Sequence, residues 1–190
     1  LTTLLISTLF ITITSLYAVG EHFERVDYQS AVNPRNVDLV DVDGDGKNDV
    51  IIGGWNSDDG YRVLIYQNTT TTSHIDENSL QLAVTLQDVY NPVIADIDND
   101  GIYDVACIKP VDNLLMVFRG LSNNSITFDS GTSFTIGSGA RLPAVSDIDG
   151  DGKIDIIIPH GNDQNFSYLL NNSTSGTIDL SSPTSVSVGE

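Results

Sequence analysis

Short apolar runs separated by polar turns recur along the chain after residue 19. The runs are four to eight residues long and rich in β-branched and aromatic side chains, and Gly, Asn and Pro fill the turns between them. Both features are typical of short β-strands. No stretch after residue 19 places its apolar residues at helical spacing over a useful window. The pattern therefore predicts an all-β protein.

The runs follow one another in a fixed order around an acidic loop. The loop leads directly into a first run, such as 50–52, and a polar turn separates this run from a second one, such as 61–66. A turn rich in Asn, Ser and Thr then leads to a third run, such as 82–86, and a fourth run, such as 92–95, enters the next acidic loop. The unit of the repeat is therefore about four short strands.

Four-stranded units that repeat with a period of about 50 residues are the blades of a β-propeller. The run after each loop is apolar at consecutive positions, which indicates a strand buried on both faces between neighbouring blades. A β-sandwich or a β-solenoid is the alternative. We expect a partial propeller over 19–190, with about three blades in units at about 41–95, 96–146 and 147–190. Because the sequence stops within a unit and propellers need about 4–8 blades to close, we expect a fragment of a longer propeller.

The N-terminal segment has a different pattern. An apolar run from Leu4 to Ala18 precedes the polar Glu21, which resembles the hydrophobic region of a secretory signal peptide with cleavage after Ala18. The run is shorter than the roughly 20 residues of a spanning helix, so we expect no membrane-spanning segment in the mature chain. We predict a signal peptide at 1–18, without its basic start, and a secreted, extracellular or cell-envelope location. Recurring Ile and Thr leave a core strand as the alternative.

Charge adds a chemical feature to this picture. Eight Lys and Arg residues face 26 Asp and Glu residues, which gives a formal net charge of −18. A polyanion repels nucleic acid and anionic membrane surfaces, so we expect neither as a partner. Twelve of the acidic residues lie in the three acidic loops, four in each. Such local concentration indicates cation binding, and three divalent ions would change the charge from −18 to −12.

The three loops share the pattern Asp-x-Asp-x-Asp-Gly-x-x-Asp, and their first aspartates, Asp41, Asp96 and Asp147, are 55 and 51 residues apart. Ca²⁺ takes about 6–8 oxygen ligands. Aspartates at positions 1, 3, 5 and 9 supply carboxylates, Gly at position 6 permits a sharp turn, and the carbonyl of position 7 supplies a neutral oxygen. The pattern predicts about three bound Ca²⁺ ions, held by Asp41, Asp43, Asp45, Lys47 and Asp49, by Asp96, Asp98, Asp100, Ile102 and Asp104, and by Asp147, Asp149, Asp151, Lys153 and Asp155.

Other interpretations of the loop fit less well. Mg²⁺ resists losing its water, and Zn²⁺ prefers Cys and His ligands that the loops lack. An EF-hand needs Glu at position 12, where this chain has Ile52, Cys107 and Ile158, and it needs helices on both sides. A dockerin-like module needs helices as well. An Asp/Gly-rich turn without an ion is the remaining alternative, and the threefold recurrence argues against it.

The acidic loop, the three apolar residues after its last aspartate and turns such as Tyr168–Asn172 resemble the FG-GAP/VCBS repeats, the calcium-loop β-propellers of integrin-α-like and many secreted proteins. The resemblance covers about residues 23–190. Clear Phe-Gly and Gly-Ala-Pro elements are missing, so the chain is more similar to the VCBS branch. The resemblance implies a seven-bladed propeller, an extracellular or envelope location, and a role in adhesion or in protein or carbohydrate binding.

Three functions fit these observations. We prefer a non-catalytic adhesion or ligand-binding module, in which Ca²⁺ braces each blade and the ligand is an extracellular protein or carbohydrate. The second is the propeller segment of a larger extracellular enzyme, such as a polysaccharide-active lyase or hydrolase. However, His22, His74 and His160 are isolated from one another, and no Ser-His-Asp or metal-histidine set has a defensible spacing, so we expect no catalytic residue. The third is a purely structural repeat.

Two residues are weak candidates for a ligand-binding face. Trp55 and His160 both follow the strand after an acidic loop, at what the sequence suggests are equivalent places, away from the loop. Trp suits stacking on sugars and suits interfaces. The alternative is that both are turn residues capping the edge of a blade. Cys107 lies in an apolar run, so we expect it to be a buried hydrophobic residue.

Overall fold

The computed structural model describes residues 11–15, 24–28, 33–71, 76, 78–161 and 164–189. Within these ranges the chain forms β-strands, and it contains no helix of the length and hydropathy that crossing a membrane requires. The strands are β1 (Ile11–Ser15), β2 (Glu24–Tyr28), β3 (Asn33–Val40), β4 (Asp49–Asn56), β5 (Gly60–Asn68), β6 (Leu80–Gln87), β7 (Tyr90–Ala95), β8 (Asp104–Lys109), β9 (Leu114–Phe118), β10 (Thr132–Thr135), β11 (Ala144–Ser146), β12 (Asp155–His160), β13 (Asn165–Leu169) and β14 (Thr184–Ser187).

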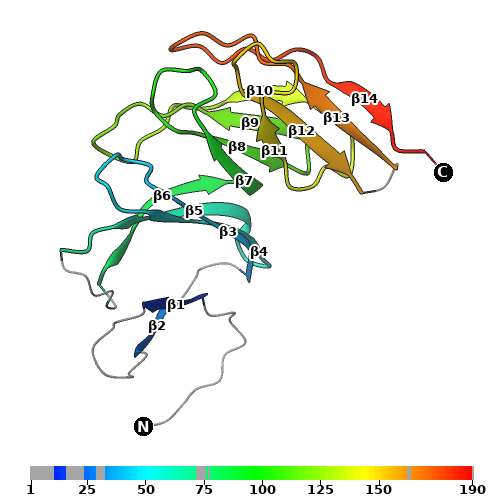
Figure 1. Cartoon of the computed structure of the whole chain (residues 1–190). Helices are drawn as coiled ribbons and strands as arrows, with labels where there is room; N and C mark the ends of the chain where they lie inside the picture. Colours follow the sequence, from blue (N-terminus) through cyan, green and yellow to red (C-terminus); the bar gives the residue numbers. More distant parts are fainter. Residues whose placement is uncertain are drawn as a thin grey trace.

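Three four-stranded sheets make up most of the described chain. Strands β3 to β6 form the first sheet, β7 to β10 the second and β11 to β14 the third, and in each sheet the strands are neighbours in chain order. All their pairings are antiparallel. Figure 1 shows the sheets following one another in chain order, from cyan to red. The predicted all-β class is confirmed. The sheets are consistent with propeller blades, and in the described part of the chain they do not close into a ring.

The sheets are offset from the units suggested by the sequence. The strand before each acidic loop belongs to the sheet that follows, not to the sheet before it. For example, β7 pairs with β8 across the second loop, with Ala95 opposite Asp104. Each acidic loop is therefore the hairpin connection between the first and second strands of one sheet. The sheets span 33–87, 90–135 and 144–187. A periodic pattern fixes the length of a repeat but not the point at which a sheet begins.

The core lies between the sheets. One apolar cluster joins the first two sheets and includes Ile51, Val63 and Cys107. A second cluster joins the second and third sheets and includes Ala106 and Ile156. Neighbouring residues of β8 thus point into different clusters, which follows from the alternation of side chains along a strand. The prediction that the strand after a loop is buried on both faces is confirmed for β4 and β8. Cys107 is fully buried, as expected.

The segment predicted as a signal peptide, 1–18, lies mostly outside the described residues. The structure describes only 11–15 of it, which form β1 and pair antiparallel with β2, with Ile11 opposite Tyr28 and Ser15 opposite Glu24. A strand here agrees with the recurrence of Ile and Thr, because β-branched residues favour strands. The signal peptide stays a prediction.

Candidate metal sites

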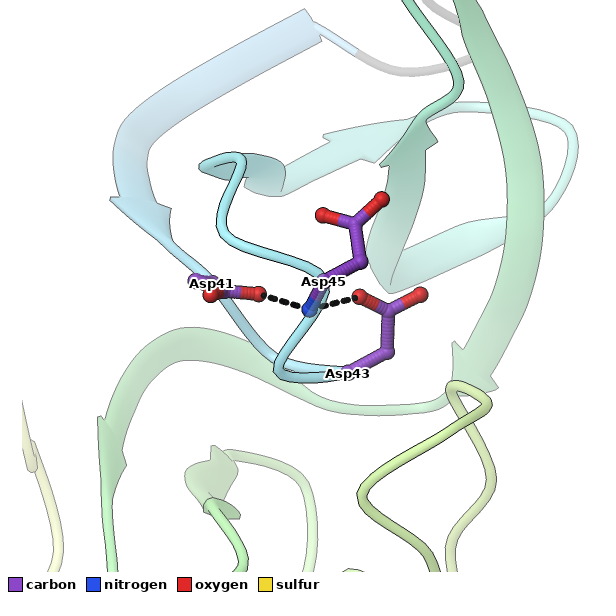
Figure 2. A group of neighbouring side chains, drawn as sticks. All are labelled: Asp41, Asp43 and Asp45. Atoms are coloured by element: carbon purple, nitrogen blue, oxygen red, sulfur yellow. Dashed lines mark hydrogen bonds between the residues drawn. The ribbon is translucent and has the colours of Figure 1, made fainter.

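Three groups of aspartates come together in the three hairpin loops. In the first loop Asp41, Asp43 and Asp45 each offer a carboxylate oxygen, and these oxygens lie within 4.8 Å of one another. In Figure 2 the carboxylates of Asp41 and Asp43 flank the backbone nitrogen of Asp45. In the other two loops the aspartates at positions 1, 3 and 9 converge within the same distance: Asp96, Asp98 and Asp104 in the second loop, and Asp147, Asp149 and Asp155 in the third.

Hydrogen bonds inside each loop fix its shape. The first aspartate accepts a hydrogen bond from the backbone N–H of the glycine at position 6, with a distance of 2.9 Å in all three loops. That glycine has a φ of 87° in the first loop, 86° in the second and 88° in the third. This is the left-handed region that glycine adopts without steric strain. The recurring spacing of Asp and Gly therefore wraps the chain around the first carboxylate.

The residue at position 7 also takes part in the hydrogen bonds within each loop. Its backbone N–H donates to the carboxylate of position 5, at 2.9 Å for Lys47, 2.8 Å for Ile102 and 2.8 Å for Lys153. The lysine side chain of the first loop also pairs with Asp45, at 2.8 Å. The carbonyl oxygens of these three residues stay predicted ligands.

The aspartate at position 9 links the loop, through hydrogen bonds, to the end of the third strand of the same sheet. Asp104 is fully buried, and both of its carboxylate oxygens accept backbone hydrogen bonds, from Ile97 at 2.8 Å and from Gly120 at 2.8 Å. One donor is the second residue of the loop and the other follows the third strand of the sheet. The other two loops repeat this arrangement with Asp49, Val42 and Asn68, and with Asp155, Ile148 and Asn171.

Burial makes two of the carboxylates at position 9, those of Asp49 and Asp104, harder to ionise in the absence of a cation. Desolvation raises the pKa of Asp104 to about 6, against the lowering effect of its hydrogen bonds from Gly120 and Ile97, and nearby Asp98 raises it further. Burial likewise raises the pKa of Asp49. A bound cation would offset both desolvation and mutual repulsion, because it favours the charged form.

The donor set fits calcium. Ligand oxygens on opposite sides of one Ca²⁺ ion are separated by about 4.6–5.2 Å, twice the usual Ca–O distance, so oxygens within 4.8 Å of one another can share an ion. All the converging groups are carboxylates, which are hard ligands suited to Ca²⁺, Mg²⁺ or Mn²⁺ rather than Zn²⁺. The position 9 carboxylates already accept two backbone hydrogen bonds each, so they also have a structural role that needs no ion.

The second residue of each of the first two loops packs into the core shared with the sheet that follows in the chain, whereas the second residue of the third loop is exposed. The apolar residue at position 2 is 4% exposed for Val42, 2% for Ile97 and 42% for Ile148. In the second loop, Asp98 accepts a hydrogen bond of 2.8 Å from the N–H of Gly176, in the turn after β13. The side-chain amide of Asn171 also donates to the carbonyl of Ile97, at 2.7 Å. The second loop is thus held between two sheets.

The two predicted ligand-face residues do not occupy equivalent places. Trp55 is six residues after Asp49, whereas His160 is five residues after Asp155. Because side chains alternate along a strand, this difference places them on opposite faces of their sheets, so the expected equivalence is wrong. Trp55 lies in β4 and is 39% exposed, but His160 is 6% exposed.

The environment of His160 is structural. Its Nδ1 lies 3.0 Å from the carbonyl oxygen of Ser138, and its Nε2 lies 2.9 Å from Oγ of Ser167. Both ring nitrogens are therefore engaged inside the third sheet, and His160 does not form a surface together with Trp55.

Some residues that donate hydrogen bonds to the aspartates of the site could not be identified from the loop pattern. The backbone donors Asn68, Gly120 and Asn171 stand directly after or close to the end of a third strand, in the turns rich in Asn, Ser and Gly. Gln67 donates to Asp43 at 2.6 Å, and Gly176 reaches Asp98 from another sheet. The recurring Asn or Gly after the third strand is a clue in the sequence, whereas the contact between sheets depends on the fold.

Comparison with known proteins agrees with this architecture. The family profile for the FG-GAP-like repeat matches residues 41–107 and 96–158. Cartilage acidic protein 1 of Xenopus tropicalis is 30% identical over 141 residues, which cover 67% of this chain and 21% of that protein. The chain thus spans about a fifth of the length of this relative. Neither match distinguishes the VCBS branch. The two repeats together cover more than half of the sequence, and the chain belongs to the FG-GAP-like repeat family.

Proposed function

We propose that this chain is a calcium-braced, non-catalytic ligand-binding module of an extracellular protein. The observation that carries the proposal is the convergence of three aspartate carboxylates at the same hairpin of three successive sheets. A single acidic turn has many explanations. Three equivalent acidic turns, each between the first two strands of a sheet, indicate a shared structural role.

Calcium would stabilise each sheet at the loop where its carboxylates repel one another. In the first loop the carboxylates of Asp41, Asp43 and Asp45 approach one another closely, and in water such groups repel. Lys47 balances part of this charge through its pair with Asp45. A divalent ion at the centre would neutralise the rest and hold the ends of two strands together. Millimolar extracellular Ca²⁺ fills even sites with a Kd of about 10⁻⁴–10⁻³ M.

The biological setting is inferred from the family and from the relative. FG-GAP-like repeats suggest an integrin-like ligand-binding module, and the relative is named for cartilage. We propose a secreted or cell-envelope location, and adhesion to an extracellular protein or carbohydrate as the activity. We further propose that the three sheets are part of a seven-bladed propeller, which the four-stranded repeat supports, and that the chain belongs to the VCBS branch, since it lacks clear Phe-Gly and Gly-Ala-Pro elements.

Nothing in the described residues supports catalysis. The nearest arrangement to a catalytic pair is His160 with Ser167, but both side chains are buried and the imidazole Nδ1 contacts a backbone carbonyl rather than a carboxylate. The acidic surface also supports the expectation that nucleic acid and anionic membranes are not partners, because the net charge of −18 repels both.

Calcium removal tests the proposal. Three sites, each at ten times its Kd, would add about 4 kcal/mol of stability, since each contributes RT ln(1 + [Ca²⁺]/Kd). That corresponds to a rise in Tm of about 8–16 °C for a domain of this size. We therefore expect EGTA to lower the Tm strongly, and an equal concentration of Mg²⁺ to restore little of it. Thermal unfolding followed by circular dichroism, with calorimetric titration of Ca²⁺, measures both.

Two sets of variants separate calcium binding from general charge effects. Replacing the first aspartate of every loop with Asn (Asp41, Asp96 and Asp147) should abolish the dependence of the Tm on Ca²⁺. Replacing three aspartates outside the loops (Asp58, Asp88 and Asp112) removes the same charge and should leave the dependence intact. A Tm that is the same with Ca²⁺ and with EGTA in the unaltered protein would contradict the proposal.

A further inference from the structure

A cleft of about 570 Å³ lies at the end of the sheets away from the acidic loops. It is lined by Arg35, Trp55, Tyr61, Tyr90, Asn91, Arg141 and Leu142. These residues stand at the start of β3, β5 and β7, at the end of β4 and just before β11. All of these are strand ends remote from the loops, so the cleft is separate from the candidate metal sites. Its volume is in the range of pockets that bind small molecules, about 300–1,000 Å³.

The repeat brings three equivalent residues to this cleft. Arg35, Tyr90 and Arg141 each stand six residues before the first aspartate of a loop, namely Asp41, Asp96 and Asp147. The first strands of successive sheets lie side by side, since β7 contacts both β3 and β11. Equivalent positions on these strands therefore converge, and two of the three carry a guanidinium group.

The two arginines differ from most other basic residues of the described chain in their ionic contacts. Among the described basic residues, Lys47, Arg62, Lys109 and Arg119 each form an ion pair with an aspartate. No described carboxylate forms an ion pair with Arg35 or Arg141, although the chain has 26 acidic residues. In so acidic a protein, two arginines without an ion-pair partner among the described carboxylates, in one cleft, are a local reversal of charge.

The position of Arg141 is fixed by its neighbours. Its backbone N–H donates to the carbonyl of Pro159 at 2.9 Å, and a Cβ atom at Gly161 would lie 2.6 Å from its Nε. The guanidinium thus rests against the bare backbone of a glycine. Burial raises the pKa of Tyr90. The positive charge of Arg141, a side-chain hydrogen bond from Arg141 and the positive charge of Arg35 oppose this rise, which agrees with both guanidinium groups lying near the Tyr90 hydroxyl.

Aromatic rings form the other part of the wall. Trp55 is directly opposite Tyr61 in the pairing of β4 with β5, and the rings of Tyr61 and Tyr90 have centroids 4.8 Å apart. The Tyr90 hydroxyl donates to the carbonyl of Ala140 at 3.1 Å, which holds this ring in place between the second and third sheets. Trp55 remains partly exposed at the mouth, where a planar ring can stack on a ligand.

We propose that this cleft binds an acidic saccharide, a sugar chain that carries carboxylate or sulfate groups. Arginine holds such groups through two parallel hydrogen bonds, and the aromatic rings stack on the apolar faces of sugar rings. The inference rests on the proposed ligand-binding function and narrows it to one ligand class and one site. An acidic peptide would also interact with arginine, but it offers no rings with the flat apolar faces that this aromatic wall suits.

The single tryptophan of the chain provides a direct probe, because Trp55 lies in the cleft. The experiment titrates the whole chain, in millimolar Ca²⁺ and physiological salt, with a uronic acid tetrasaccharide and a sulfated tetrasaccharide. A neutral tetrasaccharide and an oligoaspartate peptide serve as controls. We expect a saturable change in Trp fluorescence with the uronate, the sulfated sugar or both, and weaker or no binding of the two controls.

Variants assign the binding to the cleft. Arg35→Gln and Arg141→Gln should each weaken binding about tenfold or more, the loss expected when one charge-assisted contact is removed. Gly161→Ala should also weaken it by displacing the Arg141 side chain. Arg62→Gln is the matched control. The Arg62 guanidinium already pairs with Asp59, so its removal should not change the affinity.

The proposal is overturned if neither acidic saccharide changes the fluorescence, if the peptide or the neutral sugar binds equally well, or if both arginine variants bind like the unaltered protein. Calcium-dependent unfolding is measured on the same samples. Loss of the calcium effect counts against the proposed calcium brace, whereas a normal calcium effect without saccharide binding counts against the cleft alone. If one arginine variant shows no calcium-dependent unfolding and so is not folded, the binding affinity of the other arginine variant tests the proposal.

Discussion

The aspartate at position 9 of each loop has two roles at once. Asp49, Asp104 and Asp155 are buried, and each joins its loop to the end of the third strand through two backbone hydrogen bonds. Asp104 and Asp155 also take part in the clusters that could hold a cation. The hydrogen bonds join protein groups only, so their contribution and that of a bound ion can be measured separately.

Asp104→Asn tests the structural role. The amide keeps one acceptor oxygen, but its NH₂ group then faces one of the two backbone donors, from Ile97 or Gly120, in a fully buried place. Leaving a buried donor without a partner, together with the lost charged hydrogen bond, should lower the free energy of unfolding by about 3 kcal/mol. Urea unfolding in EGTA measures this without a contribution from calcium.

The control for this substitution is Asp112→Asn, which breaks an exposed ion pair with Lys109 and should change stability by less than about 0.5 kcal/mol. If Asp104→Asn destabilises the protein in Ca²⁺ but not in EGTA, the residue acts only as a metal ligand, and its two backbone hydrogen bonds contribute little to stability.

The raised pKa of Asp104 predicts how pH affects calcium binding. Its folded pKa of about 6 lies above its usual value of 3.8, so the metal-free folded state holds this proton more tightly than the unfolded state does. The metal-free protein should therefore gain stability from this group as the pH falls from 7 towards 4. Calcium needs the ionised carboxylate, so its affinity for the second loop should weaken below about pH 6.

Two measurements check this pH effect. The calcium-induced rise in Tm should be smaller at pH 5 than at pH 7, and calorimetry near pH 6 in buffers of different ionisation enthalpy should detect release of a proton on binding. Asp104→Asn should abolish that release. Equal calcium-induced shifts at pH 5 and pH 7 would mean that the carboxylate is ionised throughout this range.

At the scale of elements, the second and third loops have the same sequence pattern but different surroundings. Asp98 is 1% exposed and receives a hydrogen bond from Gly176 of the next sheet, whereas Asp149 is exposed. Asp98→Asn should therefore lower the Tm by several degrees more than Asp149→Asn, both in Ca²⁺ and in EGTA, because it disturbs a contact between sheets. Thermal unfolding of the two variants side by side measures the difference. Equal effects would show that the contact between sheets contributes little.

The sequence predicts the strands well because their pattern is local. Consecutive apolar residues after each loop indicated strands buried on both faces, and the structure agrees for β4 and β8. The converging aspartates were also predictable, since a loop of nine residues with Gly at position 6 can bring its own carboxylates together. The limits of the sheets were not predictable, because the repeat does not show whether β7 pairs with the strand before it or after it.

Contacts between sheets account for what the sequence did not reveal. The cleft joins Arg35, Trp55 and Arg141, which are far apart along the chain and meet only because three first strands lie side by side. Trp55, which is predicted for a ligand face from its chemistry, lines this cleft, and the prediction that it binds a ligand stays a prediction. His160 is one position out of register with Trp55 and lies on the opposite face of its sheet. Aligning the three repeats on their first aspartates would have shown the recurring position of Arg35, Tyr90 and Arg141.

For the whole molecule, the net charge of −18 opposes compaction as well as association. Twelve of the acidic residues are gathered in three loops, so the repulsion is strongest where the carboxylates converge. Calcium and salt relieve this repulsion differently, because an ion held between carboxylates neutralises them directly, while dissolved salt only screens them.

Salt should therefore stabilise the metal-free protein more than the calcium-loaded one. Raising NaCl from about 0.1 M to about 1 M shortens the Debye length from about 10 Å to about 3 Å, which weakens repulsion between loops and within them. The Tm in EGTA should rise over this range by more than the Tm in Ca²⁺, where three ions have already changed the charge to −12. The variant with Asn at Asp41, Asp96 and Asp147 should show a reduced salt effect in EGTA, since its loops carry less charge. An equal rise with and without Ca²⁺ would mean that the loops are not the main source of repulsion, and that calcium stabilises the sheets through geometry rather than through charge.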